Sequence, residues 1–342
     1  DGVRAFVGVV VSVLVKDSDI LLIDEPEAFL HPPQAYALGR FLADRTPTTK
    51  QLLVATHSSD FLRGLIDHGD SRVRVLRIER DGESNRTSEL QPDEVKRVWS
   101  DPLLRFSKVL DGLFHQGAVV CEGDGDCRFY AAVADAIGGD DIPTDVSWLY
   151  GAGKSRVATI IEALRAVQVP VRAVLDFDVL SSAKELQKIV EALGGEWSSF
   201  EPDFNVVKSA VDQKRPELLL EDVRRGFEEA LNKVKTATIP NDSLAEIREI
   251  LKRGSPWGEA KKVGKGFIPS GDQSAAFNRL NAKLRQIGAF VVEVGELESF
   301  CKSIPGHGPA WVAAALERPI ASDRELEAAR IFVRELLSDW IH

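Results

Sequence analysis

The sequence predicts an α/β protein with two parallel sheets, the second of which carries a helical insertion. Short apolar runs alternate with helical stretches along residues 1 to about 90, and a second such series runs from residue 117 to residue 193. A polar, mainly helical stretch from about 201 to 286 follows, before a last apolar run at 289–294. Short continuous apolar runs are typical of buried parallel strands, which predicts two sheets covered by helices.

Composition limits the class of protein. Charged residues make up 28% of the 342 residues, apolar residues 44%, and the net charge is −10, as expected for a globular protein with two cores. The longest apolar run, 6–15, is too short to span a bilayer and is expected to form a buried helix; no membrane partner is expected. The cysteines Cys121, Cys127 and Cys301 have neither zinc nor disulfide spacing, which favours a reducing cytoplasm.

The first series contains apolar runs and helical stretches in alternation. Strands are expected at 20–24, 51–56 and 73–78, and helices at 34–44 and 60–66. The turn-forming residues at 81–85 predict a hairpin at the sheet edge. Two further helices are expected at about 92–99 and 102–114.

The second series reads as a βαβαβα unit with short links, the pattern of a parallel sheet covered by helices. Strands are expected at 117–121, 146–150, 171–176 and 289–294, and helices at about 126–137, 154–167, 182–193, 297–303 and 309–341. Residues 205–286 hold 16 Lys and Arg against 11 Asp and Glu, although the whole chain is acidic. This basic stretch is a candidate DNA-contacting surface, and a solvated helical face explains the charge equally well.

The first motif lies at the end of the strand at 20–24. Asp24 and Glu25 follow four apolar residues, and His57 follows the next strand. At the carboxyl end of a buried strand, an aspartate can hold Mg²⁺ and the next glutamate can polarise an attacking water. The string Asp24 to Pro32 with His57 resembles ABC-type ATPases, in which the acidic pair is the Walker B motif and the histidine senses the γ-phosphate.

The phosphate-binding loop of such an ATPase is absent before Asp24. Residues 151–155 read Gly-Ala-Gly-Lys-Ser, but Trp148 stands where the first glycine of that loop belongs, so this stretch is rejected as a phosphate loop. We therefore expect residues 1–115 to be the carboxyl-terminal half of an ABC-type ATPase domain. On its own this chain should neither bind nor hydrolyse ATP.

The second motif is a set of acids at strand ends. Glu122 and Asp126 follow the strand at 117–121, and Asp176 and Asp178 lie at the end of the strand at 171–176. Alternation along a strand would point Asp176 and Asp178 the same way with Phe177 packed behind them. Carboxylates converging at one sheet edge need cations, and oxygen ligands suit Mg²⁺, Mn²⁺ or Ca²⁺. Asp126 can alternatively be a helix cap.

These acids resemble the Toprim domain, and a Toprim domain after an ABC-type ATPase resembles the OLD (overcoming lysogenisation defect) family of nucleases. Two further stretches match, 255–261 and 294–300. The resemblance implies a Toprim domain at 116–303 with its helical insertion at about 201–286, followed by carboxyl-terminal helices at 304–342.

By the same resemblance Glu298, or less favourably Glu296, joins the metal ligands, and a lysine supports the transition state. Lys261 is the first choice for that lysine, with Lys154 and Lys283 as alternatives. Lys262 and Lys265 are expected to contact DNA together with Lys261.

The predicted function is a DNA endonuclease that uses two Mg²⁺ or Mn²⁺ ions, with Ca²⁺ as a modulator, and that is coupled to ATP in the full-length protein. Phage defence or DNA repair, a homodimer of the full-length protein and a helicase partner are family-level implications. The alternatives are another Toprim enzyme, such as a topoisomerase or primase, and a non-catalytic DNA-binding scaffold. A topoisomerase would need a nucleophilic tyrosine, and the sequence offers only Tyr36, Tyr130 and Tyr150.

Overall fold

The computed structural model describes most of the chain. The described residues are 2–342 without 16–17, 70–71, 94–107, 140–144, 152, 167, 215–219, 235–237, 241–242, 245, 248–249, 251–254, 339 and 341–342. Among the described helices, none has the length and apolar character that crossing a membrane requires.

The amino-terminal part pairs two parallel strands, β1 (Ile20–Asp24) and β2 (Gln51–Ala55), as expected. Helices α1 (Gly2–Val15), α2 (Pro32–Arg45) and α3 (Ser59–Gly69) accompany them. The core of this part is small and includes Val13, Leu38, Leu42 and Phe61.

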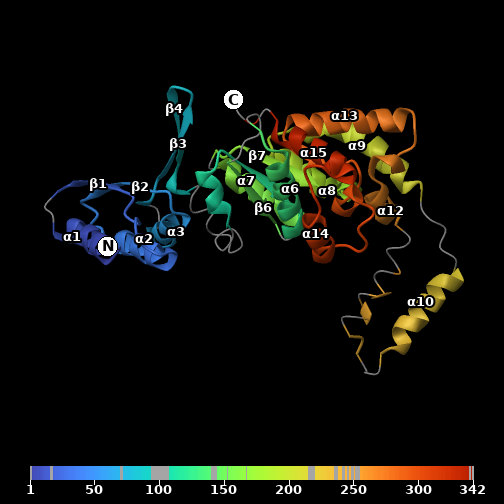
Figure 1. The fold of residues 1–342 in the computed structure, drawn as a ribbon, viewed down its shortest axis with the longest axis horizontal. Helices are drawn as coiled ribbons and strands as arrows, with labels where there is room; N and C mark the ends of the chain where they lie inside the picture. The colour runs from blue at the N-terminus through green and yellow to red at the C-terminus, as the bar shows by residue number, and fades with distance from the viewer. Residues whose placement is uncertain are drawn as a thin grey trace.

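The expected burial of the helix at 6–15 is wrong, although the helix forms. Val13 is fully buried, but Val3, Val7 and Leu14 expose half or more of their surface. Leu22 of β1 is likewise 78% exposed. Among the described residues, the core formed with α2 and α3 covers only one side of α1 and β1. The opposite sides of α1 and β1 therefore remain uncovered (Figure 1).

A two-stranded antiparallel hairpin follows, β3 (Val75–Asp81) and β4 (Ser84–Leu90), as predicted. Its expected place at the edge of the first sheet is wrong, because β3 and β4 pair only with each other among the described strands and form a sheet of their own. The buried Arg77 of β3 donates hydrogen bonds to the carbonyl oxygens of Leu113, His115 and Gln168. The hairpin is thereby fastened to the second part of the chain. Of the two helices expected next, the first lies almost wholly outside the described residues, and the end of the second is the 3-10 helix η2 (Lys108–Phe114).

The second part is built on a parallel sheet of four strands in the order β6-β5-β7-β8. The strands are β5 (Gly117–Cys121), β6 (Val146–Tyr150), β7 (Val171–Leu175) and β8 (Ala289–Val291). β8 is shorter than expected because the chain turns at its end, where the amide of Gly295 donates to the carbonyl of Val292.

Helices cover both faces of this sheet (Figure 1). Val119 and Cys121 of β5 pack with α6 (Asp124–Ile137), α14 (Pro309–Leu316) and α15 (Glu327–Leu337). Their neighbours Ala118 and Val120 pack with the opposite layer, which includes α7 (Lys154–Ala166) and α8 (Ala183–Ala192). Alternate residues of a strand face opposite sides, so apolar runs fill both cores.

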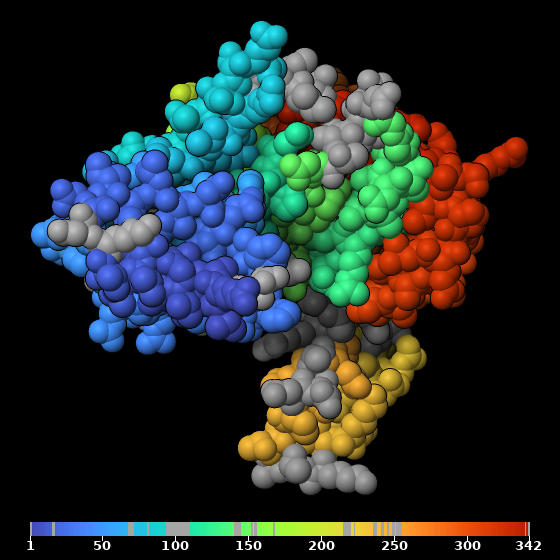
Figure 2. All heavy atoms as spheres, turned by 60° about the vertical axis from the view of Figure 1, so that its left-hand side comes forward, coloured from blue at the N-terminus to red at the C-terminus, as the bar shows by residue number. Residues whose placement is uncertain are grey.

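The connection between β7 and β8 is long and helical, as predicted. It contains η3 (Phe177–Ser181), α8, α9 (Trp197–Asp212), α10 (Leu220–Asn232), α12 (Pro256–Val263), η4 (Gly264–Phe267) and α13 (Asp272–Gln286). α9 and α13 pack together, whereas α10 projects from the body (Figures 1 and 2). α12 returns to lie against η3, at the carboxyl edge of the sheet.

Candidate metal centre and its basic neighbour

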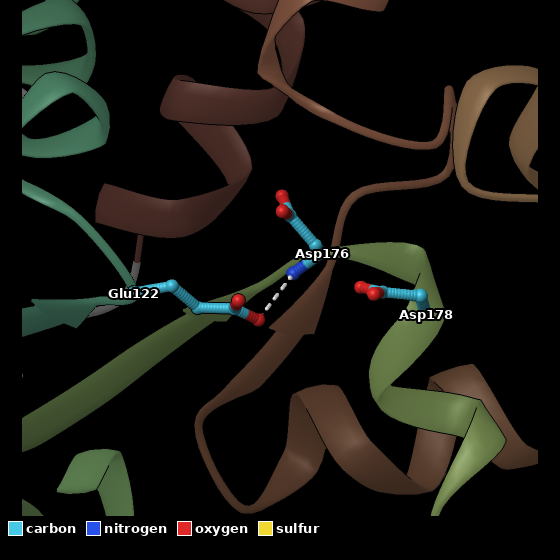
Figure 3. Close-up of side chains that lie close together, drawn as sticks. All are labelled: Glu122, Asp176 and Asp178. Atoms are coloured by element: carbon cyan, nitrogen blue, oxygen red, sulfur yellow. Dashed lines mark hydrogen bonds between the residues drawn. The ribbon is translucent and has the colours of Figure 1, made fainter. Parts of the chain in front are cut away.

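Three acidic side chains meet at the carboxyl edge of the second sheet (Figure 3). Glu122 directly follows β5, and Asp176 and Asp178 follow β7. One oxygen from each of the three carboxylates lies within 4.8 Å of the others. The Glu122 carboxylate also accepts a hydrogen bond of 3.1 Å from the backbone amide of Asp176, which ties the ends of the two strands together.

The local geometry of the Asp-x-Asp motif differs from the expected one. β7 ends at Leu175, Asp176 is the N-cap residue of η3, and Asp178 lies inside this 3-10 helix. A tight helical turn, and not strand alternation, therefore presents the two aspartates. Phe177 between them is fully buried and packs on Phe277, with ring centroids 5.7 Å apart.

Lys261 comes from the last turn of α12 and reaches the same acids. Its Nζ atom lies 2.8 Å from Asp176 Oδ2 and 3.9 Å from Asp178 Oδ1. Burial alone would lower the pKa of Lys261, but the neighbouring carboxylates, Asp176 foremost, outweigh this and raise it above its ordinary value. The carboxylates of the acidic cluster thus favour the charged form of Lys261.

Two more acids line this site from the 3-10 helix η5 (Leu297–Phe300). Glu296 is its N-cap residue and has an oxygen 3.9 Å from Lys261 Nζ. Burial and the nearby Glu298 raise the pKa of Glu296. The Glu298 side chain accepts a 2.7 Å hydrogen bond from the amide of Gly308, so the loop before α14 holds one of its oxygens.

Asp126 takes the alternative role considered for it, that of a helix cap, and it lies outside the group of three acids whose oxygens meet. It is the third residue of α6, and its carboxylate accepts a 2.8 Å hydrogen bond from the amide of Gly123 at the start of that helix. Burial, followed by the charge of Asp176, raises the pKa of Asp126 to about 7. A helix-capping carboxylate that resists ionisation in this way is electrostatically part of the acidic cluster.

Three of the other predicted lysines pair with acids outside the group of three that meet. Lys262 is exposed and pairs with Glu259, while Lys265 pairs with Glu293 at 3.3 Å. Lys283 is held by the backbone carbonyl of Ser199 and by Asp203, between α13 and α9. Lys154 begins α7, and its side chain is outside the described residues.

The amino-terminal motif residues also meet at strand ends. His57 Nε2 lies 3.5 Å from Glu25 Oε1, and Asp24 is the last residue of β1. Glu27 has no place in the sequence-based prediction, yet its carboxylate accepts hydrogen bonds from the Thr56 hydroxyl and from the His57 amide. Its position within the Asp24 to Pro32 string is the sequence feature that could have indicated a role for Glu27.

The donor set of the acidic cluster fits a hard divalent cation. Glu122, Asp176 and Asp178 offer only carboxylate oxygens, close enough together to share one ion. Such donors suit Mg²⁺, Mn²⁺ or Ca²⁺ and lack the nitrogen and sulfur atoms that zinc prefers.

Two comparisons with known proteins found similar sequences. Residues 1–63 match a family model described as "AAA domain, putative AbiEii toxin, Type IV TA system". The chain is also 24% identical over 173 residues to the Old nuclease of Escherichia phage P2, a match that covers 49% of this chain and 29% of that protein. The chain thus spans less than a third of that relative's length. These two similarities support a relationship to the OLD family and to its ATPase-like domain.

Proposed function

We propose that this chain carries a metal-dependent endonuclease centre of the Toprim type, which hydrolyses phosphodiester bonds in DNA. The observation that carries the proposal is the meeting of Glu122, Asp176 and Asp178 with the Lys261 ammonium at the carboxyl edge of a parallel sheet. Ligands bind at this edge in open α/β sheets. The similarity to the Old nuclease supports this reaction class.

The residues divide into ion-holding and charge-balancing groups. Glu122, Asp176 and Asp178 would hold one divalent cation, and Asp126 and Glu298 would contribute to binding a second. Two such ions, when bound, would supply an activated water and stabilisation of the leaving 3′ oxygen. Lys261 supplies a fixed positive charge beside Asp176, where it can neutralise charge that develops on the scissile phosphate. Lys262 and Lys265 extend the positive surface along the DNA backbone.

The test is cleavage of supercoiled plasmid with Mn²⁺ or Mg²⁺. We expect nicking by the wild-type chain, loss of nicking in Asp176→Ala, and retained nicking in Asp135→Ala, which removes an exposed acid of α6. DNA binding without nicking in any metal would instead favour the scaffold. Equal activity of the Asp176→Ala and wild-type chains would refute the proposed centre.

A topoisomerase is the second candidate, and the tyrosines bear on it. Tyr130 is buried, and the Tyr36 hydroxyl donates to Asp67 in the amino-terminal part. Tyr150 is 49% exposed at the carboxyl end of β6, next to the strand that leads to Glu122. A topoisomerase would trap DNA covalently on Tyr150, so an active Tyr150→Phe variant that nicks like wild type would exclude it.

The amino-terminal part is proposed to be half of an ATPase site, with Asp24, Glu25 and His57 at the nucleotide. In the full-length protein this module would act as a homodimer and couple ATP to DNA cleavage, with a helicase as a candidate partner, in phage defence or DNA repair. The match of residues 1–63 to an AAA domain supports this assignment.

A further inference from the structure

The backbone segment that carries Lys261 is pressed against the loop after β8 at two glycines. Gly264 ends α12 at a φ of +66°, and Gly295 lies in the loop at a φ of +119°. Residues other than glycine rarely adopt such positive φ angles. The two glycines therefore mark a place where conformation as well as space excludes a Cβ atom.

The contact at each glycine is with backbone. A Cβ atom on Gly295 would overlap the carbonyl oxygen of Lys261 and lie 2.9 Å from its carbonyl carbon. A Cβ atom on Gly264 would overlap the carbonyl oxygen of Glu293 and lie 2.5 Å from the Gly295 amide. Backbone cannot rotate away as a flexible side chain can, so neither position can take alanine without separation of the two segments.

Hydrogen bonds extend this contact to the metal centre. The Lys265 amide donates to the Glu293 carbonyl, and the Phe177 amide, between the two aspartates, donates to the Gly295 carbonyl, both at 2.8 Å. The Ser299 hydroxyl donates to the Lys262 carbonyl at 3.0 Å. The loop at 293–299 thus joins the strand end that bears Asp176 to the helix that bears Lys261.

We infer that Gly264 and Gly295 form a backbone clasp that positions the Lys261 ammonium against Asp176. Neither glycine is a catalytic residue; both act through the distance between α12 and the acids. The inference rests on the proposed function for its catalytic consequence, since the clasp sets how closely Lys261 can approach the cluster. A new Cβ atom at either glycine would push α12 and the loop apart by about 1 Å to remove the overlap. That separation would move the Lys261 Nζ atom out of its 2.8 Å contact with Asp176.

Gly295→Ala opens the clasp, and Gly306→Ala is its matched control. Gly306 has a φ of +88°, but a Cβ atom there would have no neighbour within 4 Å. The control therefore imposes the same kind of backbone strain without the close approach. Any difference between the two variants reports the separation of α12 from the loop.

The first readout is the acetylation of Lys261 relative to Lys262, measured by mass spectrometry after brief treatment of the metal-free chain with acetic anhydride. Lys262 is exposed on the same helix and serves as the internal reference. Release of Lys261 from Asp176 should raise the Lys261 to Lys262 ratio at least about threefold, because an amine that no longer contacts the carboxylate is more accessible to the reagent. The ratio should stay at the wild-type value in Gly306→Ala.

The second readout compares the rate of plasmid nicking in Mn²⁺ with the affinity of the chain for Mn²⁺. Gly295→Ala should nick on the order of 100-fold more slowly, the usual cost of a displacement near 1 Å, while it still binds Mn²⁺. An unchanged acetylation ratio in folded Gly295→Ala, or an equal change in Gly306→Ala, would overturn the clasp. If Gly295→Ala does not fold, hydrogen exchange of the wild-type chain decides, because the Lys265 and Phe177 amides donate across the clasp and should be strongly protected; exchange of both amides at the rate of exposed amides would overturn the inference. A wild-type chain that never nicks refutes the proposed function alone, and the acetylation ratio still tests the clasp.

Discussion

Replacement of Asp126 by asparagine tests the electrostatics of the acidic cluster without a change of shape. The pKa of Asp126 is raised from 3.8 to about 7, first by burial and then by the charge of Asp176. Below pH 3.8 the Asp126 carboxyl is protonated in both the folded and the unfolded chain, so its ionisation does not change the free energy of unfolding. Between pH 3.8 and about 7 the folded chain binds the extra proton, so stability falls as the pH rises through this window.

The size of the effect follows from the same two values. Each tenfold difference in proton affinity corresponds to about 1.4 kcal/mol, so the ionised Asp126 side chain destabilises the metal-free chain by at most about 4 kcal/mol above pH 7. Asparagine has no charge and can still accept the hydrogen bond from Gly123. At pH 8 without metal, Asp126→Asn should therefore melt at least about 5 °C above wild type, whereas at pH 4.5 the two should be within about 2 °C.

The assay is thermal unfolding across pH 4.5 to 8, with Asp135→Asn as the control. Asp135 lies on the same helix but is exposed, so its replacement should leave the pH dependence unchanged. Addition of Mn²⁺ at pH 8 should reverse the order of the two chains, since only the wild type gains a carboxylate ligand. Parallel melting curves for Asp126→Asn and wild type at all pH values would refute the assignment of Asp126 to the cluster.

Three further predictions follow from the described contacts. Lys261→Met should nick DNA on the order of 100-fold more slowly yet bind Mn²⁺ at least as tightly as wild type in a calorimetric titration, because Lys261 competes with the metal for Asp176. Lys188→Met, which removes an exposed lysine of α8, should nick at nearly the wild-type rate, and equal losses in the two variants would contradict a special role for Lys261. Arg77→Met should lower the free energy of unfolding by about 3 kcal/mol in urea titrations, because three backbone carbonyls lose a buried charged donor. Arg80 is exposed on the same strand, so Arg80→Met should change the free energy of unfolding by less than about 0.5 kcal/mol. ATP should leave the nicking rate of this chain unchanged, and measured ATP turnover by the chain would contradict the expectation that its nucleotide site is incomplete.

The meeting of the acids was predictable from the sequence because it depends on one rule of topology. Glu122 and Asp176 each follow a short apolar run, and parallel strands end at a common edge. The local path after β7 was not predictable in the same way. An Asp-Phe-Asp sequence suits both a strand and a 3-10 turn, and the early end of β7 at Leu175 decides between them.

Burial of α1 was overestimated for a different physical reason. Apolar residues on all sides of a short helix indicate that it prefers burial, but they do not identify which element covers each face. Val13 packs in the small core beside α2, whereas Val3 and Val7 face outward among the described residues. The length of an apolar run therefore predicts the helix better than it predicts the helix's surroundings.

Lys261 illustrates what a sequence leaves open even when it points to the correct region. The basic stretch from 205 to 286 contains many lysines, and resemblance alone favoured the one in α12. Its proximity to Asp176 depends on two glycines, one in each of two segments joined through α13 and β8. In a sequence, each glycine indicates only a local turn. Their mutual contact becomes visible in three dimensions, and it explains how a lysine from an inserted helix comes to lie beside an aspartate at a strand end.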